Sequence, residues 1–392
     1  MQDNALKLVL LLKDGNPAND ASCDGIAHWL AEAEGAEILE TKIPELAGVQ
    51  KTKAMNAAKN LVFGNRRDAR EWLALANGDM LVRQVGQWFA ERNVREGSSE
   101  VLILSSGSSS APYNLAMGYI WRCFSATAGI PDVVGTEPFD FAIVHELEFP
   151  ERKANIFVTS GPLNSITEEK IKLAGEKFLA EFPSGKEHIW SLIIGGNNRE
   201  YRISAEWIKR NVGSLAQIAE KAKASLYILL MNRIDSEASR ILKNIEARSS
   251  GNIRIFAKEE NNYDPRTGMY GVSEKIFCTE DQQETIFDAL ASGIKPVLLK
   301  TGYTTGFQMK LQDLTEWLVQ AGALSVRALW GAKKRSLTID NLIRKNFVTE
   351  FKYWKSPICR EEADEYCDTL EKPFNEAQDA AAWIAGKIRI YR

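Results

Sequence analysis

The chain has 392 residues, of which 45% are hydrophobic and 26% charged, and its formal net charge is −3 at pH 7. This composition is typical of a folded protein with about two domains and excludes a disordered chain. The negative net charge argues against a general nucleic-acid-binding protein, which needs a basic excess to neutralise phosphates. Five scattered cysteines without a C-x-x-C pair favour reduced thiols in the cytoplasm over a zinc site or a disulfide framework.

The first half of the chain predicts a doubly wound α/β domain over residues 1–183. Residues 6–12 form the continuous apolar run that is typical of a central parallel strand. The polar segment 13–20 is expected to be a loop, followed by a helix over residues 22–33. Further strands are expected at residues 37–43, 101–104, 132–134, 141–144 and 156–158, with a helix between the second and third of these that ends near residue 126.

Two polar corners of this domain follow predicted strands, where doubly wound folds bind ligands. The first corner contains Asp14, Asn16 and Asn19, and the second contains Ser106 and Gly107. Flexible turn chemistry explains the serines of the second corner as well as ligand binding does.

His145 follows the predicted strand at residues 141–144 and is one of only three histidines in the chain. A single histidine beside a strand is more often structural. Its position directly after a strand end nevertheless makes His145 a candidate general base.

The strand–helix pattern starts again after a linker at residues 183–186, which predicts a second domain over residues 184–326. Its strands are expected at residues 188–194, 226–231, 253–257, 275–279 and directly after Pro296, and its helices include residues 205–223 and 307–321. A charged helix expected at residues 167–182 precedes the linker and falls in the first domain.

Polar loops collect at one edge of this second sheet, around Gly195, Arg233, Asn262 and Asp281. The Gly195–Gly196 pair lets the backbone approach a ligand closely. Arg199 and Arg233 have the charge and geometry to clamp a diphosphate. Each loop alone is explained as well by a plain turn.

The turn at residues 279–285 is the most informative of these loops. A helix that begins there directs free backbone N–H groups and the positive end of its dipole towards the sheet edge, which suits a phosphate. The carboxylate and amide groups of Glu280, Asp281, Gln282 and Glu284 suit the hydroxyls of a sugar. An ordinary polar N-cap is the alternative explanation of the turn alone.

Residues 327–360 contain nine basic residues against two acidic ones, with five aromatic residues interleaved. Basic and aromatic side chains together fit an anionic membrane surface or an acidic acceptor. The alternative is a helix folded back over the first domain, with its aromatic side chains buried and its cations in solvent. Residues 327–392 are therefore expected to form a helical C-terminal extension.

Four segments carry a pattern in a fixed order along the chain: DGNPAN at residues 14–19, NIFVTSGPLN at 155–164, IIGG at 193–196, and the segment 279–296 with its Thr279, Asp281, Gly293 and Pro296. This pattern resembles that of the mitochondrial fission ELM family, whose bacterial members are regarded as candidate glycosyltransferases of the GT-B fold. The corresponding family motifs are D-G-K-P-G-H, N-V-L-x-T-x-G-A-L-N, hydrophobic-I-G-G and T-x-D-S-x-S-M-x-x-E-A-x-A-T-G-K-P. Arg233 falls at the family's S-R-R-T segment.

Several positions depart from the family's pattern. The histidine of the family's first loop is Asn19 here, its serines after the aspartate are Gln282 and Glu284, and its glutamate is Asp288. Loss of the histidine removes an obvious base, so either a carboxylate or another histidine takes its place or the chain has diverged in substrate or activity. The exchanged serines change the contacts expected with a nucleotide or a sugar.

The resemblance implies a GT-B-like α/β fold of two Rossmann-like, doubly wound domains that face a cleft. It implies transfer of a sugar from a nucleotide-sugar on the second domain to a cell-envelope or surface glycan acceptor on the first. Helix N-termini and basic side chains stabilise the departing diphosphate in such an enzyme, without a metal ion or a cofactor, while a base deprotonates the acceptor hydroxyl. Asp14 is the first candidate base and His145 the second.

The candidate donor-binding residues are Gly195, Gly196, Asn197, Asn198, Arg199, Arg233, Glu280, Asp281, Gln282 and Glu284. The candidate acceptor-side residues are Asn16, Asn19, Ser106 and Gly107. The expected partners are a nucleotide-sugar and a glycan or lipid-linked acceptor, and not nucleic acid. The expected location is the cytoplasm, with a peripheral contact to the inner face of a membrane through residues 327–360.

Two other classes of function stay open. Two Rossmann-like halves also suit a nucleotide-sugar epimerase or a dehydrogenase, although no G-x-G-x-x-G motif or Tyr-x-x-x-Lys pair stands in a suitable place. The family's link to fission also allows a non-catalytic scaffold with a degenerate site and an interaction surface around residues 327–360.

Overall fold

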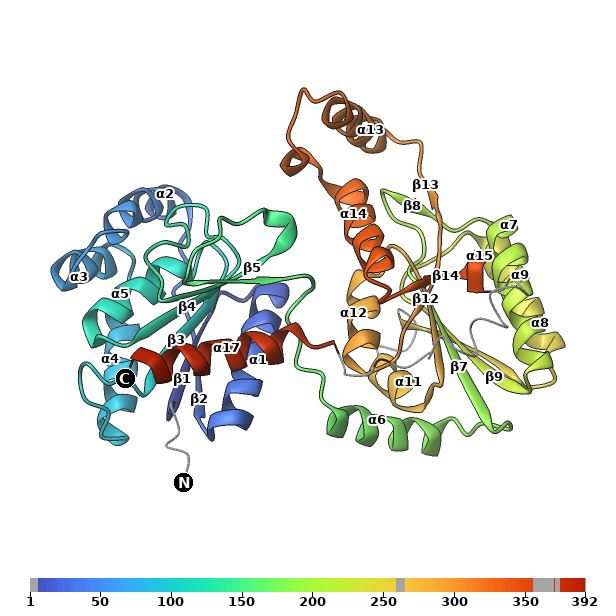
Figure 1. The fold of residues 1–392 in the computed structure, drawn as a ribbon, viewed down its shortest axis with the longest axis horizontal. Coiled ribbons are helices and arrows are strands. Elements are labelled where there is room, and N and C mark those ends of the chain that lie inside the picture. The colour runs from blue at the N-terminus through green and yellow to red at the C-terminus, as the bar shows by residue number, and fades with distance from the viewer. Residues whose placement is uncertain (1–5, 259–264, 355–369, 371–373, 392) are drawn as a thin grey trace. The chain divides into compact units, whose positions relative to one another are not determined.

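The computed structural model describes residues 6–258, 265–354, 370 and 374–391 (Figure 1). The chain divides into two compact units, Met1–Ser165 with Asn375–Arg392 and Ile166–Phe374. Each unit contains a six-stranded parallel sheet with a hydrophobic core on either face. The predicted α/β class, with two Rossmann-like doubly wound domains, is therefore confirmed.

The sheet of the first unit has the strand order β2-β1-β3-β4-β5-β6, and every neighbouring pair is parallel. Its strands are β1 (Leu8–Lys13), β2 (Glu37–Lys42), β3 (Val101–Ser106), β4 (Phe124–Ala128), β5 (Phe141–His145) and β6 (Ile156–Thr159). Successive side chains of β1 alternate between the two faces. Leu10 and Leu12 pack into one core, and Val9 and Leu11 pack into the other.

Helices cover both faces of this sheet. One face carries α2 (Gly48–Ala57), η1 (Ala58–Leu61), α3 (Arg66–Leu75), α4 (Asp79–Glu91) and α5 (Ala111–Trp121), and the other carries α1 (Pro17–Glu34) and α17 (Glu376–Tyr391). The predicted terminal helix, α17, lies alongside α1 in Figure 1. Ile384 and Ile388 of α17 are buried there, and Arg389 forms an ion pair with the buried Glu34.

Three expectations for the first unit were wrong: the start of its first helix, the strand at residues 132–134, and the end of the helix expected near residue 126. Helix α1 begins at Pro17 rather than at residue 22, because the Asn16 side chain accepts a hydrogen bond from the Ala18 N–H at 3.0 Å and proline fits the first helical position. Residues 132–134 form a turn, and the strand expected there is instead β4. Helix α5 stops before Arg122, which adopts a left-handed conformation with φ 52°.

The sheet of the second unit has the order β10-β9-β7-β11-β12-β14 and is also parallel throughout. Its strands are β7 (His188–Ile194), β9 (Ala224–Leu230), β10 (Ile253–Ala257), β11 (Lys275–Thr279), β12 (Val297–Leu299) and β14 (Thr349–Glu350). Numbered along the chain, this order is third, second, first, fourth, fifth, sixth, which is the Rossmann order. A small antiparallel ribbon joins β8 (Tyr201–Arg202) to β13 (Gly302–Tyr303).

Helices also cover both faces of the second sheet. One face carries α6 (Glu168–Glu181), α11 (Arg266–Val272), α12 (Gln283–Ala291) and α14 (Gly331–Arg344), and the other carries α7 (Ala205–Trp207), η3 (Ile208–Val212), α8 (Gly213–Lys221), α9 (Ser236–Arg248) and α15 (Phe351–Trp354). Helix α13 (Phe307–Gln320) differs from these, because only Met309 and Gln312 of it are buried.

The unit boundaries differ from the predicted domain boundaries after residues 183 and 326. Helix α6 belongs to the second unit, because Ile171 and Phe178 pack into its core. Gly175 of α6 also packs so closely on Gly271 of α11 that a Cβ atom would lie 3.1 Å from the Gly271 backbone. Residues 327–374 belong to the second unit as well, and only the segment from residue 375 onward returns to the first.

The described part of the basic and aromatic segment packs within the second unit, whereas one expectation had placed the segment over the first domain. Phe351 is buried in the second unit, and Phe347 packs against the core there. Lys355, Arg360 and Asn262 lie outside the described residues, as do the side chains of Tyr353 and Trp354. Within the described ranges, every helix is too short or too polar to span a bilayer.

Candidate functional site

Each unit brings its predicted site residues to one point of its sheet. In the first unit, β2 and β3 lie on opposite sides of β1, so the connections after β1 and β3 leave the sheet in opposite directions. The same divergence occurs between β7 and β11 of the second unit. Open α/β sheets bind ligands in the crevice at this point, outside the carboxyl ends of the strands.

The corner after β1 is held together by Asp14. Its Oδ1 accepts the Asn16 N–H at 3.0 Å, and its Oδ2 accepts the Asn19 Nδ2–H at 2.9 Å. Gly107, after β3, closes against this pair with φ +88°, and a Cβ atom on it would lie 2.3 Å from Asn19 Nδ2. The two predicted corners therefore touch, and the contact requires glycine.

A pocket of about 330 Å³ opens beside this contact and lies wholly within the first unit. Its lining includes Asn19, Ser106, Gly107 and His145, whereas Asp14 and Asn16 do not line it and instead shape the loop. The pocket also contains Glu148, which we did not predict. The only sequence signal for Glu148 is a carboxylate three residues after His145.

A hydrogen bond to Nδ1 helps to orient the His145 ring. Its Nδ1 accepts the Leu147 N–H at 3.0 Å. A neutral imidazole that accepts at Nδ1 carries its proton on Nε2, so the tautomer assigned by this hydrogen bond presents a donor. This arrangement suits stabilisation of a bound oxygen better than removal of a proton.

In the second unit, Gly195 after β7 meets Asp281 after β11. A Cβ atom on Gly195 would lie 1.7 Å from Asp281 Oδ2, and the Gly195 N–H donates to Thr279 Oγ1 at 2.9 Å. Burial raises the pKa of Asp281. Its Oδ1 is buried and accepts no hydrogen bond from the described residues. A buried carboxylate oxygen of this kind is suited to accept a hydrogen bond from a ligand hydroxyl.

Helix α12 begins next to Asp281. Its N-cap residue, Gln282, makes no side-chain cap and instead donates from Nε2 to Asp281 Oδ2 at 3.2 Å. No N-cap side chain therefore accepts hydrogen bonds from the N–H groups in the first turn of α12. An anion that binds at a helix N-terminus needs such available N–H groups. Glu284 is exposed and lies 3.7 Å from Arg266 in an ion pair.

Glu280 supports the neighbouring loop. Its Oε1 accepts the Thr301 N–H at 2.9 Å and the Thr301 hydroxyl at 3.2 Å. The side chain is 4% exposed, and burial raises its pKa. Through these hydrogen bonds, Glu280 holds the backbone at Thr301 next to the site.

Amide side chains hold the loop after β7 in place through hydrogen bonds to backbone N–H groups. Asn197 Oδ1 accepts the Ile203 N–H at 2.7 Å, and Asn198 Oδ1 accepts two backbone N–H groups at 2.8 Å. Gly196 has φ +96° and packs against the backbone after β9. The side chains of Arg199 and Arg233 are exposed at this loop edge.

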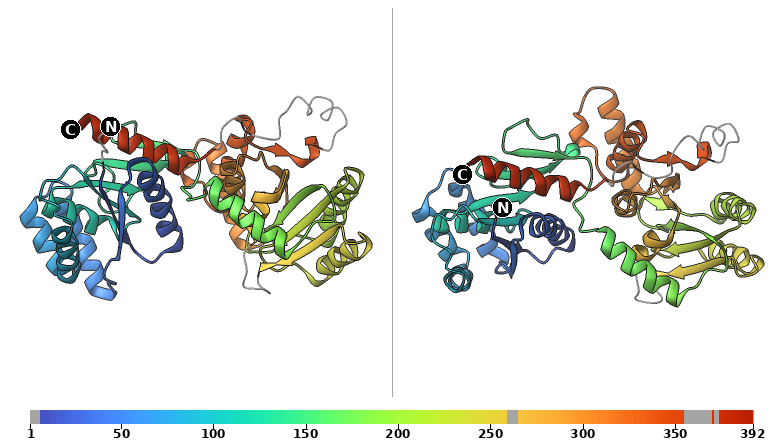
Figure 2. Two further views of the ribbon diagram at one scale, coloured as in Figure 1. Left: turned by 90° about the horizontal axis from the view of Figure 1, so that it is seen from below. Right: turned by 60° about the horizontal axis from the view of Figure 1, so that its bottom comes forward.

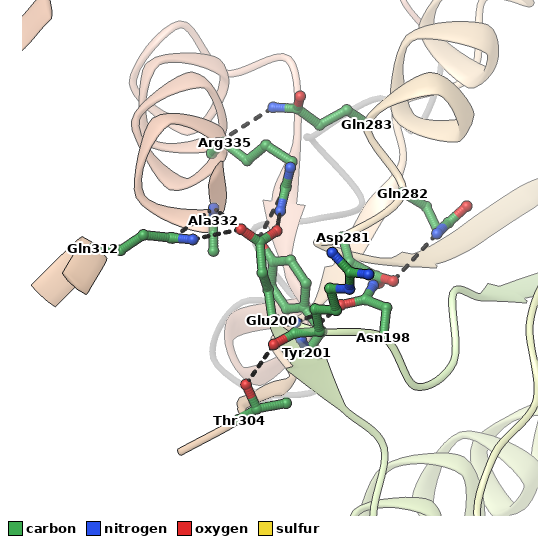
Figure 3. A network of polar contacts seen from close by, with 11 residues as sticks. Asn198, Glu200, Tyr201, Asp281, Gln282, Gln283, Thr304, Gln312, Ala332 and Arg335 are labelled. Carbon is green, nitrogen blue, oxygen red and sulfur yellow. Dashed lines mark hydrogen bonds and ion pairs between the residues drawn. The ribbon is translucent and has the colours of Figure 1, made fainter. Parts of the chain in front are cut away.

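A polar network connects this loop to α14, and Figure 3 shows it. Glu200 Oε1 accepts Gln312 Nε2–H at 2.5 Å and the Ala332 N–H at 3.3 Å, while its Oε2 pairs with Arg335. The Arg335 guanidinium lies 5.3 Å from the centre of the Tyr201 ring, and burial lowers the pKa of Arg335. Sequence reasoning missed this network, because it joins residues more than a hundred positions apart.

Across the part of the chain that the structure describes, no three His, Cys, Asp or Glu side chains are arranged to hold a metal ion. The roles expected of the individual site residues stay predictions, since the geometry shows where they lie and not what they bind.

Comparisons with known proteins give one family and several solved structures. The family model described as mitochondrial fission ELM1 matches residues 19–388. No curated protein matches the sequence.

Three solved structures illustrate the similarity to known folds. A glycosyltransferase from Rickettsia africae ESF-5 is 12% identical, with 98% of this chain and 99% of that chain covered and a TM-score of 0.37. MurG from Acinetobacter baumannii is 11% identical, with 98% and 99% covered and a TM-score of 0.41. UDP-GlcNAc 2-epimerase from Methanocaldococcus jannaschii is 14% identical, with 86% and 100% covered and a TM-score of 0.44. At TM-scores this low, the three similarities carry no argument about activity.

Proposed function

The chain belongs to the mitochondrial fission ELM1 family, and from this premise we propose that it is a glycosyltransferase of GT-B type. It moves a sugar from a nucleotide-sugar to a glycan or lipid-linked acceptor of the cell envelope or surface. The observation that carries the proposal is the contact of Gly195 with Asp281 beside the N-terminus of α12. This contact combines a place for a phosphate with a buried acceptor for a sugar hydroxyl.

On the donor side, the diphosphate lies at the first turn of α12, where the helix dipole favours negative charge. The exposed guanidinium groups of Arg199 and Arg233 neutralise its remaining charge, and no metal ion is needed for that task. Asp281 Oδ1 accepts a hydroxyl of the ribose or of the sugar. The glycines at positions 195 and 196 allow the backbone to approach the ligand.

On the acceptor side, the hydroxyl enters the pocket lined by Asn19, Ser106 and His145. Glu148, which lines this pocket, takes the proton of that hydroxyl as the hydroxyl oxygen attacks the anomeric carbon. The bond between the anomeric carbon and the diphosphate breaks, and the nucleoside diphosphate leaves. His145 donates from Nε2 to a bound oxygen rather than acting as the base.

The second candidate function is a non-catalytic scaffold with a degenerate site. Both oxygens of Asp14 already accept hydrogen bonds within the protein, and Nδ1 of His145 is also engaged. Asn19 stands where the resembled family motif has a histidine. These observations favour the scaffold if the acceptor side has lost its base.

Thermal unfolding with UDP, GDP, ADP, CMP or NAD tests the proposal. A ligand at about 100 times its Kd stabilises the folded state by roughly 2.7 kcal/mol. We expect one nucleoside diphosphate to raise the melting temperature of the second unit. Arg233→Ala should reduce that shift, whereas Arg240→Ala, which removes an exposed arginine of α9, should leave it unchanged.

The alternatives give different results in the same panel. A response to no nucleotide supports the scaffold. A response to NAD alone contradicts the transferase and supports a dinucleotide enzyme.

A further inference from the structure

Helix α13 and the loop after it carry many of the large hydrophobic side chains that are exposed in the described residues. Six of the sixteen large hydrophobic side chains that are exposed in the described residues fall between residues 307 and 326. They are Phe307, Leu311, Leu314, Trp317, Leu324 and Val326. Phe307 is 81% exposed and Trp317 is 61% exposed. A contiguous patch of this kind on a folded protein marks an interaction surface.

The patch lies on a helix that its own unit hardly covers. Helix α13 contacts α14 and η4 (Val326–Ala328), and only Met309 and Gln312 of its fourteen residues are buried. In Figures 1 and 2, α13 stands away from the sheet of the second unit. Hydrogen bonds from Gln312 of α13 and Ala332 of α14 to Glu200 connect α13 to the rest of the second unit. The anchored helix therefore holds its apolar side chains in a fixed orientation.

The charged side chains of the segment are positive on balance. Its two carboxylates, Asp313 and Glu316, both pair with Lys333 of α14, at 2.9 Å and 2.7 Å. The other charged residue of α13, Lys310, is exposed, and so is Arg327 at the end of the segment. Counted with Lys333, the segment carries three cations against two carboxylates, so the charge beside the apolar patch is net positive. A surface that is apolar and cationic is complementary to an anionic lipid interface.

We propose that α13 and residues 321–327 form a docking surface for anionic membranes. Helix α13 lies in the plane of the membrane–water interface when it binds. Phe307, Leu314 and Trp317 enter the boundary between headgroups and acyl chains, and Lys310 and Arg327 contact the headgroups. A pairing surface for a second copy is favoured less, because the exposed apolar side chains continue past the helix to Leu324 and Val326. This surface differs from the segment 327–360 that sequence reasoning indicated, and it does not depend on the proposed transfer reaction.

Co-sedimentation of the full chain with lipid vesicles tests this surface. We expect binding to vesicles of phosphatidylcholine with phosphatidylglycerol, and much weaker binding to phosphatidylcholine alone. The double variant Phe307→Ser, Trp317→Ser should bind about tenfold less, because it removes the two largest apolar side chains. Lys310→Gln should bind about fivefold less, and only to the anionic vesicles.

Phe63→Ser is the matched control, because Phe63 is 91% exposed on the first unit and should not affect binding. All these positions are exposed, so the variants should melt like the wild type. Vesicle binding that is absent, or that the double variant leaves unchanged, would overturn the proposal. A dimer in sedimentation velocity that the double variant dissociates, without vesicle binding, would assign the surface to a second copy instead.

Discussion

Two glycines define the geometry of the two candidate sites. At Gly107 a side chain would collide with Asn19, and at Gly195 it would collide with Asp281. In both places the loop after one strand touches the loop after its neighbour. A glycine is needed at each contact because it is the only residue without a Cβ atom.

The buried carboxyl of Glu280 leads to a prediction about pH. Because burial raises its pKa above 4.5, the ionised form destabilises the folded state, fully at pH values above the raised pKa. The destabilisation is relieved as the pH falls through that pKa towards 4.5. Glu280→Gln should therefore stabilise the protein at neutral pH, with the gain disappearing towards pH 4.5.

Urea unfolding of both proteins at neutral and mildly acidic pH measures this difference. The glutamine oxygen still accepts both Thr301 hydrogen bonds, so packing is conserved. A variant that is less stable than wild type at neutral pH would show that the charge of Glu280 stabilises the fold.

Some of these residues could be predicted and others could not. Gly195 and Asp281 directly follow buried strands, and the carboxyl ends of neighbouring parallel strands meet at one sheet edge. Arg335 could not be assigned, because its partner Glu200 is 135 positions away and nothing local indicates the pair. The tautomer of His145 also depends on a loop hydrogen bond that sequence alone does not reveal.

Among the elements, α17 contributes buried side chains to the core of the first unit, although it follows the second unit in the sequence. Ile384 is fully buried in the core beside α1, whereas Ile390 on the same helix is 76% exposed. Ile384→Ala should lower the free energy of unfolding of the first unit by about 2–4 kcal/mol. Ile390→Ala should change it by less than about 0.5 kcal/mol.

Calorimetry measures the unfolding free energies of the two variants. Both substitutions remove the same atoms, so a difference between the variants reports the difference in burial between the two positions. Equal effects of both substitutions would mean that α17 does not pack on the first unit in solution.

The elements were predictable where periodicity was strong. The strands β1, β7 and β11 are continuous apolar runs, and their positions are confirmed. Strand β4 was missed because its sequence, Phe124–Ala128, is dominated by small and polar side chains that become buried only through tertiary packing. The start of α1 was missed although Asn16 and Pro17 form a standard helix start.

For the whole molecule, the first unit consists of two separate stretches of chain, with the second unit between them. Charged helix α6 and the basic segment gave no local sign that they belong to the second unit. Their buried side chains pack against distant parts of the sequence, such as Phe178 against Phe256, and Ile339 lies in the same core. Domain boundaries of this type therefore cannot be located from composition and linkers.

This arrangement predicts how fragments behave. A fragment of residues 166–374 should unfold cooperatively alone, because it contains a complete sheet with both cores. Residues 1–165 alone should be unstable, since loss of α17 exposes the apolar face beside α1. Thermal melts followed by circular dichroism measure both fragments.

The matched control joins residue 165 to residue 375 by a short glycine–serine linker. The ends lie close together, because the Ser160 N–H donates to Glu376 Oε1 at 2.8 Å. The joined fragment should recover a cooperative transition. If residues 1–165 melt as sharply without α17, the helix is dispensable and the division into units is different in solution.

The return of α17 to the first unit also sets the order in which the cores are completed during synthesis. The ribosome releases residues 166–374 before residues 375–392, so the second unit can close while the first still lacks its last helix. Until the codons for α17 are translated, the nascent chain exposes the apolar face of α1 to chaperones. A premature stop codon anywhere within α17 would leave the second unit intact and the first unfinished.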